Sequence, residues 1–498
     1  MSKITKPRIV LISPQVIGAK NQVRKAQPPL GIAYLAAVLQ ERGYDEILLI
    51  DAVVEDYNNV IPLEDDPLFI KFGLSDEKII DQMKKFNPDI VGISSLFSSQ
   101  IECAFSLAKA IKKSFPEVPI VLGGNHASFM YKDVIFKDGC IDFILAGEAD
   151  YTFPEFVERF FGRDDYYRTP GLIWHDGSQI RRNPLPAFIK DLDKLPFPAW
   201  HLYDMEKYFA ISMPHNPFVK SGRVGCIITS RGCPQRCYFC SSSDHFGHVF
   251  RAMSSKRVIE MINYLVDKFA IEELQIMDDT FTTNHKRVID ICEGIKHLKL
   301  RISLPNAIRA DMPKNHEKRR NMFKSMREAG VEQIGVSVEH GDQEFLNKVI
   351  EKRLDLQEVI ATCDLAHKEG ILVHANFMMG FPFENAANRQ RTIEFAKKLD
   401  ADSFSISLAS PLPGTRMWNV VEENGLFMKS FRVNRMVYVY VNIIPHDITP
   451  EELYQVVDNL NRELNEAAQR RRPETREKYK LFKGKTAEGD RKYHFVEE

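Results

Sequence analysis

No apolar run in this chain approaches the roughly 20 residues that a helix needs to span a bilayer. The N-terminus, Met-Ser-Lys-Ile-Thr-Lys-Pro, contains no apolar signal core either, so we expect the protein to stay in the cytoplasm. An excess of charge of one sign is also missing, because 67 lysines and arginines are balanced by 68 aspartates and glutamates. Such a balance gives no general attraction to nucleic acid, and we therefore expect no nucleic-acid partner.

Cysteine is scarce, and most of it shows no pattern. Five of the eight cysteines are scattered singly among apolar neighbours, at positions 103, 140, 226, 292 and 363. The other three, Cys233, Cys237 and Cys240, crowd into eight residues. This distribution excludes a secreted disulfide framework, and such crowding in a cytosolic chain is typical of a metal site.

Residues 1–165 are predicted to form the first domain, because short apolar runs alternate there with amphipathic helical patterns. Strands that are apolar throughout, as buried parallel strands are, are predicted at 8–13, 46–51, 89–94, 118–122 and 142–145. Helices are expected between them, for example at 30–42 and 99–114. This alternation predicts a Rossmann-like, doubly wound parallel sheet, whose ligands bind beyond the carboxyl ends of the strands.

Residues 166–222 are rich in proline and are predicted to be a linker. A second alternating series follows over residues 223–415, with strands predicted at 224–229, 273–277, 301–304, 333–338, 372–377 and 403–408. Six strand-helix units in order predict a partial (β/α)6 barrel of the TIM type, with its active site at the carboxyl ends of the strands. Residues 416–498 are expected to form a small mixed segment that caps the barrel and contacts substrate, with a strand-like run at 437–441 and a long helix from 450 to about 472.

The three crowded cysteines lie directly after the first strand of the second series, in the run Thr229-Ser-Arg-Gly-Cys233-Pro-Gln-Arg-Cys237-Tyr-Phe-Cys240. Three thiolates can bind three irons of a cubane and leave the fourth iron open to a ligand that is not protein. Structural zinc is the alternative, with His245 or His248 as a fourth ligand. A closed zinc site commonly uses paired cysteines, and the chain has no second pair.

This Cys-x3-Cys-x2-Cys spacing, with the aromatic Phe239 before the last cysteine, resembles the signature of the radical S-adenosylmethionine (SAM) superfamily. The resemblance covers about residues 224–409. It implies a [4Fe-4S] cluster on Cys233, Cys237 and Cys240, whose open iron is chelated by the amino and carboxylate groups of SAM. One-electron reduction by an external flavodoxin or ferredoxin would then cleave SAM to a 5′-deoxyadenosyl radical, so the cofactors carry the chemistry.

Polar residues at successive strand ends match the positions that this superfamily uses for SAM. Asp278 and Asp279 would face the ammonium group of SAM, although a helix N-cap is an alternative role. Arg309 would pair with the SAM carboxylate, and a plain salt bridge to Asp311 or Glu339 is the alternative. The SAM contacts implied by the resemblance are Phe239, Asp278, Asp279, Arg309, Ser337 and Glu339.

The first domain resembles the cobalamin-binding domain that precedes the radical SAM barrel in one large subgroup. Matching stretches are 28–36, 88–94, 122–127 and 147–150. Glycines at a strand end let backbone approach a flat, bulky ligand, and small hydroxyls can bond to its amide side chains. The cobalamin contacts implied by the resemblance are Leu30, Ser94, Ser95, Gly123, Gly124, Asn125, His126 and Glu148.

One departure from other cobalamin proteins concerns the cobalt ligand. The loop Asp-x-His-x-x-Gly is absent, because the first strand runs into Pro14-Gln-Val-Ile-Gly-Ala without a histidine. His126 follows a different strand, and it is open to two interpretations, an axial cobalt ligand or a contact within its loop. A flavodoxin-like module that has lost its ligand is the alternative for the whole domain.

The resemblance implies a cobalamin-dependent radical SAM methyltransferase that acts at an unactivated carbon or a phosphinate. Its substrate would be a small molecule, a natural product, a lipid or a tetrapyrrole, and methylcobalamin would supply the methyl group. A radical SAM cyclase, or an enzyme that forms or rearranges carbon-carbon bonds, has the same layout. A non-enzymatic iron-sulfur redox or cobalamin sensor is a further alternative. No side-chain general base is predicted.

Overall fold

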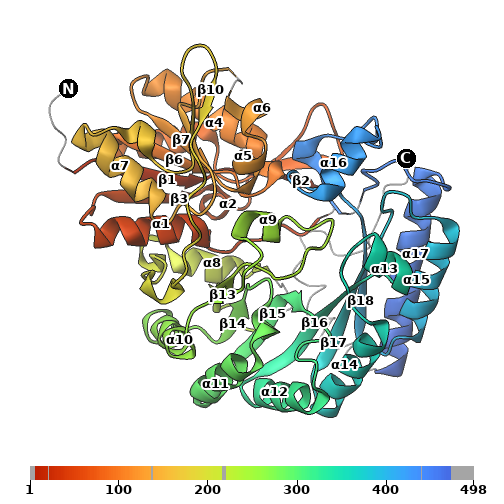
Figure 1. Cartoon of the computed structure of the whole chain (residues 1–498). Helices are drawn as coiled ribbons and strands as arrows, with labels where there is room; N and C mark the ends of the chain where they lie inside the picture. Colours follow the sequence, from red (N-terminus) through yellow and green to blue (C-terminus); the bar gives the residue numbers. More distant parts are fainter. Residues whose placement is uncertain (1–5, 21, 136–137, 216–219, 439, 473–498) are drawn as a thin grey trace. The chain divides into compact units, whose positions relative to one another are not determined.

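The computed structural model describes residues 6–20, 22–135, 138–215, 220–438 and 440–472 (Figure 1). It divides into two compact units. One unit contains Met1–Met213 with Arg432–Arg435, and the other contains Pro214–Phe431 with Met436–Glu498. Within the described residues, no helix has both the length and the apolar composition for crossing a bilayer.

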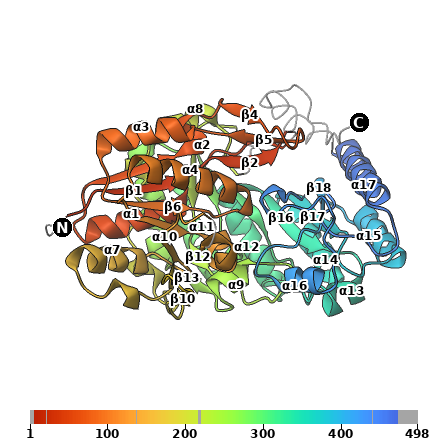
Figure 2. The same ribbon diagram turned by 90° about the horizontal axis from the view of Figure 1, so that it is seen from above.

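The first unit is built on a seven-stranded sheet, and it confirms the five strands and the Rossmann-like fold predicted from the sequence. The strands lie in the order β10-β9-β8-β7-β6-β1-β3, of which β8, β7, β6, β1 and β3 are parallel. Helices α3 (Asp76–Phe86) and α4 (Ile101–Ser114) pack on one face, while α1 (Leu30–Glu41) and α7 (Thr152–Gly162) cover the other (Figure 2). The strand bounds are β1 (Ile9–Ser13), β3 (Ile47–Asp51), β6 (Ile90–Ser94), β7 (Ile120–Gly123), β8 (Phe143–Leu145), β9 (Leu172–His175) and β10 (Ile180–Arg182).

The segment expected to be a linker carries two further strands of this sheet. Strand β9 pairs antiparallel with β8, and β10 pairs antiparallel with β9. The chain up to Met213, including helix α8 (Met205–Ile211), belongs to the first unit. These strands belong to the sheet because, without β9, the backbone N–H and C=O groups along one edge of β8 would have no partner. The prolines that suggested a linker lie between these short elements and do not prevent them.

A small antiparallel sheet in the first unit was not predicted. It has the order β2-β5-β4, with β2 (Val16–Ala19), β5 (Phe69–Phe72) and β4 (Val60–Pro62). Strands of three or four residues give too little alternation to be recognised in a sequence.

The second unit contains a six-stranded parallel sheet in strict sequence order, β11-β14-β15-β16-β17-β18, and confirms the predicted partial barrel. Helices α10 (Ser255–Phe269), α11 (His285–Ile295), α12 (His316–Glu328), α14 (Leu356–Lys368) and α15 (Ala386–Lys398) follow successive strands. Because all six strands are parallel, their carboxyl ends meet at one rim. The strand bounds are β11 (Val224–Ile227), β14 (Glu273–Ile276), β15 (Arg301–Ile308), β16 (Val331–Glu339), β17 (Leu372–Met379) and β18 (Ser403–Leu408).

Helix α17 (Pro450–Arg471) confirms the predicted long helix and covers the free edge of β18. Asn461 bonds the backbone N–H and C=O of Ile406 at 2.8 and 2.9 Å, and Asn465, one turn later, bonds those of Phe404 at 2.9 and 3.0 Å. The two amides thus pair with the strand edge as a neighbouring strand would.

The strand predicted at 437–441 is wrong for the described residues 437, 438, 440 and 441, which are irregular. Among these described residues, a backbone link to the sheet runs from the Leu408 N–H to the Tyr438 carbonyl, at 2.9 Å. The asparagine amides of α17 already occupy the edge of β18 beside Phe404 and Ile406, so an apolar run finds no free edge there. Residues 473–498 of the predicted C-terminal segment lie outside the described residues.

Candidate active site

The three cysteines lie on a loop that leaves the carboxyl end of β11 and is anchored at both sides. Strand β12 (Ser230–Arg231) pairs with β13 (Arg251–Ala252), and the Cys233 N–H donates to the Gly247 carbonyl at 3.2 Å. Gly232 has a φ of +81°, and a Cβ there would lie 2.3 Å from the Val249 carbonyl oxygen. The turn that presents Cys233 therefore requires glycine.

All three thiols are half-buried and lie close enough to act on one another electrostatically. Burial raises the pKa of Cys240 to about 12, and negative charge on Cys237 or Cys233 would raise it further. Burial likewise raises the pKa of Cys233 and Cys237. Such thiols stay protonated until a metal displaces the proton, because coordination deprotonates a thiol.

The donor set fits an iron-sulfur cubane. Within the described part of the chain, no three His, Cys, Asp or Glu side chains are grouped to hold a single metal ion. A cubane does not require the three thiolates to converge on one metal ion, since each thiolate binds its own iron. Three neighbouring thiols on one loop therefore match the three protein ligands of a [4Fe-4S] cluster with one open iron.

Asp278, expected to contact SAM, instead anchors the start of the cysteine loop. One carboxylate oxygen accepts from the Thr229 N–H at 2.6 Å, and the other accepts from the hydroxyls of Thr229 and Ser230 at 2.6 and 2.5 Å. The side chain is buried, and burial raises its pKa against the opposing charge of Arg287. With both oxygens committed to the loop, we interpret Asp278 as a positioning residue.

Asp279, the other carboxylate expected to face SAM, lies within electrostatic reach of two of the thiols. It is half-buried, and burial raises the pKa of its carboxyl while the Ser242 hydroxyl, bonded to it, acts in the opposite direction. Its charge is felt at both Cys233 and Cys240. A carboxylate beside the cluster ligands is suited to a cationic group such as an ammonium.

Arg309, expected at the SAM carboxylate, has partners within the protein. Its Nε lies 2.5 Å from an Asp311 carboxylate oxygen, which is the salt bridge that the sequence left as the alternative. Its two terminal nitrogens donate to the backbone carbonyls of Lys352 and Arg353 at 2.8 and 2.7 Å. Each of the three guanidinium nitrogens thus has a partner within the protein, and Arg309 braces the turn at 350–353.

Glu339, the last residue of β16, forms an ion pair with Lys352, a residue that sequence reasoning missed. Its carboxylate accepts from the Lys352 ammonium at 2.8 Å, with Glu339 8% and Lys352 6% exposed. The charge of Lys352 acts on Cys233 and Cys237, so this pair lies within electrostatic reach of the thiols. Nothing in the sequence separates Lys352 from the many surface lysines. Ser337 is half-buried on β16, in register with Asn376 of β17.

Phe239 joins the cysteine loop to the end of β17. Its ring lies 6.0 Å, centroid to centroid, from the ring of Phe381, which follows Gly380. The preceding Tyr238 donates its N–H to the Ile350 carbonyl at 2.9 Å and accepts from the Met417 N–H at 3.1 Å. The loop is therefore supported by packing and by backbone bonds from two other segments.

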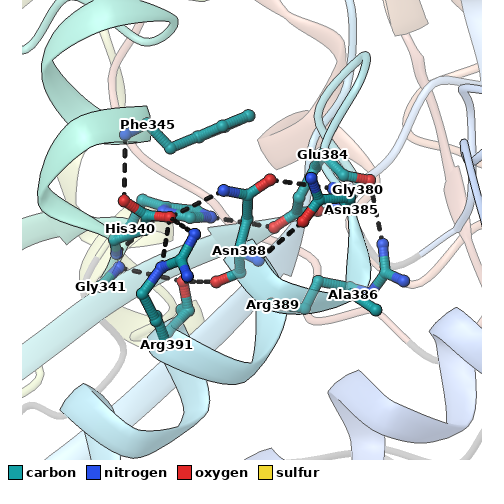
Figure 3. A network of polar contacts seen from close by, with 12 residues as sticks. His340, Gly341, Phe345, Gly380, Glu384, Asn385, Ala386, Asn388, Arg389 and Arg391 are labelled. Carbon is teal, nitrogen blue, oxygen red and sulfur yellow. Dashed lines mark hydrogen bonds and ion pairs between the residues drawn. The ribbon is translucent and has the colours of Figure 1, made fainter.

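The loop that carries Phe381 is held by a buried polar network (Figure 3). The His340 Nδ1 accepts from the Asp342 N–H at 3.1 Å, which leaves its proton on Nε2, 3.0 Å from a Glu384 oxygen. The other Glu384 oxygen accepts from the Gly380 N–H. One carboxylate thus ties the end of β16 to the end of β17. Asp342 continues the network to α15 through Asn388 and Arg391, at 2.7 and 2.6 Å.

In the first unit, the predicted cobalamin contacts gather at the carboxyl ends of β6 and β7. Ser94 ends β6, and the Ser95 N–H donates to the Gly123 carbonyl at 2.8 Å. Gly124 has a φ of +99°, and a Cβ there would lie 2.4 Å from the Ser95 carbonyl oxygen. The second glycine is therefore required by neighbouring backbone and not by a ligand alone.

Two exposed apolar side chains, which sequence reasoning missed, lie on the loop after β6. Leu96 and Phe97 are 47% and 60% exposed, while Gln100 fixes their backbone by accepting from both N–H groups at 3.1 Å. An ordered apolar surface at the carboxyl ends of parallel strands fits a large, flat ligand such as a corrin ring.

The other predicted contacts are less available. His126 is 5% exposed, with Nδ1 2.9 Å from the Ser98 hydroxyl, and burial lowers its pKa to about 4. Of its two interpretations, this favours the loop contact. Glu148 accepts from the Ile189 N–H at 2.9 Å, Leu30 is buried at the start of α1, and Asn125 begins α5 (Asn125–Phe129).

Comparisons with known proteins cover both units. The family model described as B12 binding domain matches residues 18–157, and the model described as Radical SAM superfamily matches residues 227–396. A cytidylyl-2-hydroxyethylphosphonate methyltransferase from Streptomyces wedmorensis is 30% identical over 489 residues, covering 92% of this chain and 90% of the relative. An uncharacterized methyltransferase from Pyrococcus horikoshii is 34% identical over 422 residues, covering 84% of each chain. An anaerobic magnesium-protoporphyrin IX monomethyl ester cyclase from Cereibacter sphaeroides is 26% identical, covering 91% of this chain and 69% of the cyclase.

The fold is shared with solved structures of cobalamin-binding radical SAM enzymes. The cobalamin-dependent S-adenosylmethionine radical enzyme OxsB, with aqua-cobalamin and SAM bound, gives a TM-score of 0.64 at 19% identity, covering 84% of this chain and 55% of OxsB. The radical SAM methyltransferase TsrM from Kitasatospora setae, with cobalamin and a [4Fe-4S] cluster bound, gives 0.64 at 17% identity, covering 84% of this chain and 75% of TsrM.

These findings confirm that the chain is a radical SAM enzyme, and they give the sensor alternative no support. They also confirm the three expected cofactors, a [4Fe-4S] cluster, SAM and cobalamin. The similarity to the Streptomyces enzyme extends over nearly the whole of both proteins. The chain therefore belongs to the family of cobalamin-binding radical SAM enzymes.

Proposed function

We propose that this enzyme transfers a methyl group to an unactivated carbon, or to a phosphinate, of a small polar molecule. One observation carries the proposal, the nearly full-length similarity to a methyltransferase whose name gives a cytidylyl phosphonate as its substrate. When bound, the cofactors supply a 5′-deoxyadenosyl radical to activate the substrate carbon and a cobalt-bound methyl group to transfer.

The residues of the chain bind and orient in this proposal, and none acts as a general base. Cys233, Cys237 and Cys240 hold the cluster, and Asp279 receives the ammonium group of SAM. Asp278 holds the start of the cysteine loop through its hydrogen bonds to Thr229. We assign residues 1–165 to cobalamin, 223–415 to the SAM barrel and the segment after 415 to capping and substrate contacts. An external flavodoxin or ferredoxin is the proposed electron donor.

The inner face of the barrel supports a hydrophilic ligand. Ser337, Asn376 and Ser405 are in register on β16, β17 and β18, and all three side chains are half-buried. In-register residues of parallel strands point to the same face of a sheet. Small uncharged polar groups there suit hydroxyl, amide or sugar groups better than the hydrocarbon of a lipid.

Methyl transfer is tested without knowledge of the substrate by the first half of the reaction. Anaerobically reconstituted enzyme is incubated with hydroxocobalamin, a reductant and SAM that carries a trideuterated methyl group. We expect S-adenosylhomocysteine and a deuterated methyl group on cobalamin, both detected by mass spectrometry. Cytidylyl-2-hydroxyethylphosphonate is then added as the probe substrate, and a deuterated methyl product is expected.

A different product pattern would favour the cyclase alternative, which the similarity to the Cereibacter enzyme supports. If 5′-deoxyadenosine forms while no S-adenosylhomocysteine appears and cobalamin stays unlabelled, methyl transfer is ruled out and the radical step remains.

A further inference from the structure

Lys352 holds a buried positive charge at the cluster end of the barrel. Its ammonium donates to Glu339 at 2.8 Å, and its charge acts on the Cys233 and Cys237 thiols. A lysine ammonium carries three N–H donors. Within the described residues, Glu339 is its one hydrogen-bond partner, so two donors remain for a ligand.

The turn around Lys352 is fixed from two sides. Glu351 and Arg353, its neighbours, both have positive φ, +57° and +53°, which is uncommon for residues with side chains. Arg309 donates to the backbone carbonyls of Lys352 and Arg353. The Tyr238 N–H, from the cysteine loop, donates to the Ile350 carbonyl. A strained backbone that is braced in this way is typical of a functional position.

Stability alone does not account for this ion pair. Burying two charges carries a large desolvation cost, and apolar replacements of buried pairs are often neutral or stabilising. Glu339 also has a positive φ of +69°. The chain therefore keeps a costly pair, in strained backbone, beside its cluster ligands.

The charged side chains around the thiols are complementary to the ammonium and carboxylate groups of an amino acid. Asp279 supplies a negative group for an ammonium, and the carboxylate of the same ligand needs a cation. Arg309, the expected cation, is engaged by Asp311 and two carbonyls. Lys352 is the buried cation there that has donors to offer.

We propose that the Lys352 ammonium binds the carboxylate of SAM, while Glu339 holds the Lys352 side chain in place through their hydrogen bond. The inference rests on the proposed function, because it requires SAM at the cluster. It assigns the role expected of Arg309 to Lys352 and makes Arg309 a positioning residue for the turn.

The test compares two ligands in two variants. Equilibrium binding of SAM and of decarboxylated SAM, which lacks the carboxylate, is measured on reconstituted enzyme that has not been reduced. Lys352→Met is expected to weaken SAM binding by roughly 10- to 100-fold, the value of a hydrogen bond between charged groups. Its binding of decarboxylated SAM is expected to change by less than about threefold, since that ligand has no carboxylate to lose.

Matched controls separate this role from a structural one. Lys348→Met removes an exposed lysine that pairs with Glu344, four residues upstream, and is expected to change neither affinity. Lys352→Gln, which keeps a donor toward Glu339, provides the same comparison if Lys352→Met loses iron. Iron content is measured for every variant.

The outcomes distinguish the inference from the proposed function. Equal weakening of both ligands, or unchanged SAM affinity in Lys352→Met and Lys352→Gln, would overturn the role of Lys352 alone. Wild-type enzyme with a full cluster that fails to bind SAM would contradict the proposed function itself.

Discussion

Replacing Cys237 by alanine is expected to abolish SAM cleavage, because the cluster would lose one of its three protein ligands. The three thiols come from one anchored loop, and Cys226, the nearest other cysteine in sequence, is buried within β11 before that loop begins. Two cysteines leave two irons of a cubane without protein ligands, so the cluster should not assemble or persist. Iron content and 5′-deoxyadenosine formation under reduction measure the loss, and we expect both to fall to background.

The matched control is Cys292→Ala, which removes a buried thiol on α11, away from the cysteine loop in sequence. This change is expected to cost about 1 kcal/mol of stability, as small core truncations do, and to leave iron content unchanged. A Cys237→Ala variant that retains the iron and cleaves SAM at the wild-type rate would show that the cysteines have been assigned wrongly.

Replacing Glu384 by alanine is expected to lower the free energy of unfolding of the barrel by about 3–5 kcal/mol. Its carboxylate accepts from the His340 Nε2–H and from the Gly380 N–H, and both Glu384 and His340 are fully buried. Alanine leaves these two donors without acceptors inside the protein, and unpaired buried donors are costly. Urea unfolding followed by circular dichroism measures the change.

Two further changes at the network sharpen this test. Gln at position 340 has an amide nitrogen that can replace the Nε2 donor toward Glu384, whereas Asn is too short and keeps only an acceptor near Asp342. We therefore expect His340→Gln to be less destabilising than His340→Asn. Glu344→Ala, which breaks an exposed pair with Lys348, should cost less than about 1 kcal/mol. A Glu384→Ala variant as stable as this control would refute the role of the network.

The same network that stabilises the barrel also supports the cysteine loop, through Phe381. Glu384 fixes Gly380, and the ring of Phe381 packs against Phe239 in the cysteine loop. The loop that presents the thiols is therefore supported by the ends of β16 and β17 as well as by Asp278. A loosened Glu384 loop should make the cluster more easily lost during purification.

The parts of the structure that the sequence predicted are those with strong local signals. Runs such as Ile9–Ser13 and Ser403–Leu408 are apolar, or alternate between apolar and polar residues, over five or six residues, which identifies buried strands. The spacing of Cys233, Cys237 and Cys240 identified the cluster loop, because thiolate ligands are rare and their positions are informative.

The parts that could not be predicted depend on partners distant in sequence. Arg309 was expected at SAM, but its partners at 352 and 353 are more than forty residues away. The role of Lys352 arises from its burial beside Glu339 and the thiols, which no local pattern reveals. Residues 437–441 have the composition of a strand, yet two asparagines of α17 occupy the edge of β18.

Anaerobic reconstitution of the wild-type chain, followed by metal and nucleoside analysis, measures most directly whether the three cysteines hold a cluster with an open iron. The expected result is about four irons per chain, as in one cubane, and release of 5′-deoxyadenosine from SAM when a reductant is added. Protein that carries zinc and no iron, or a full cluster that leaves SAM intact under reduction, would contradict it.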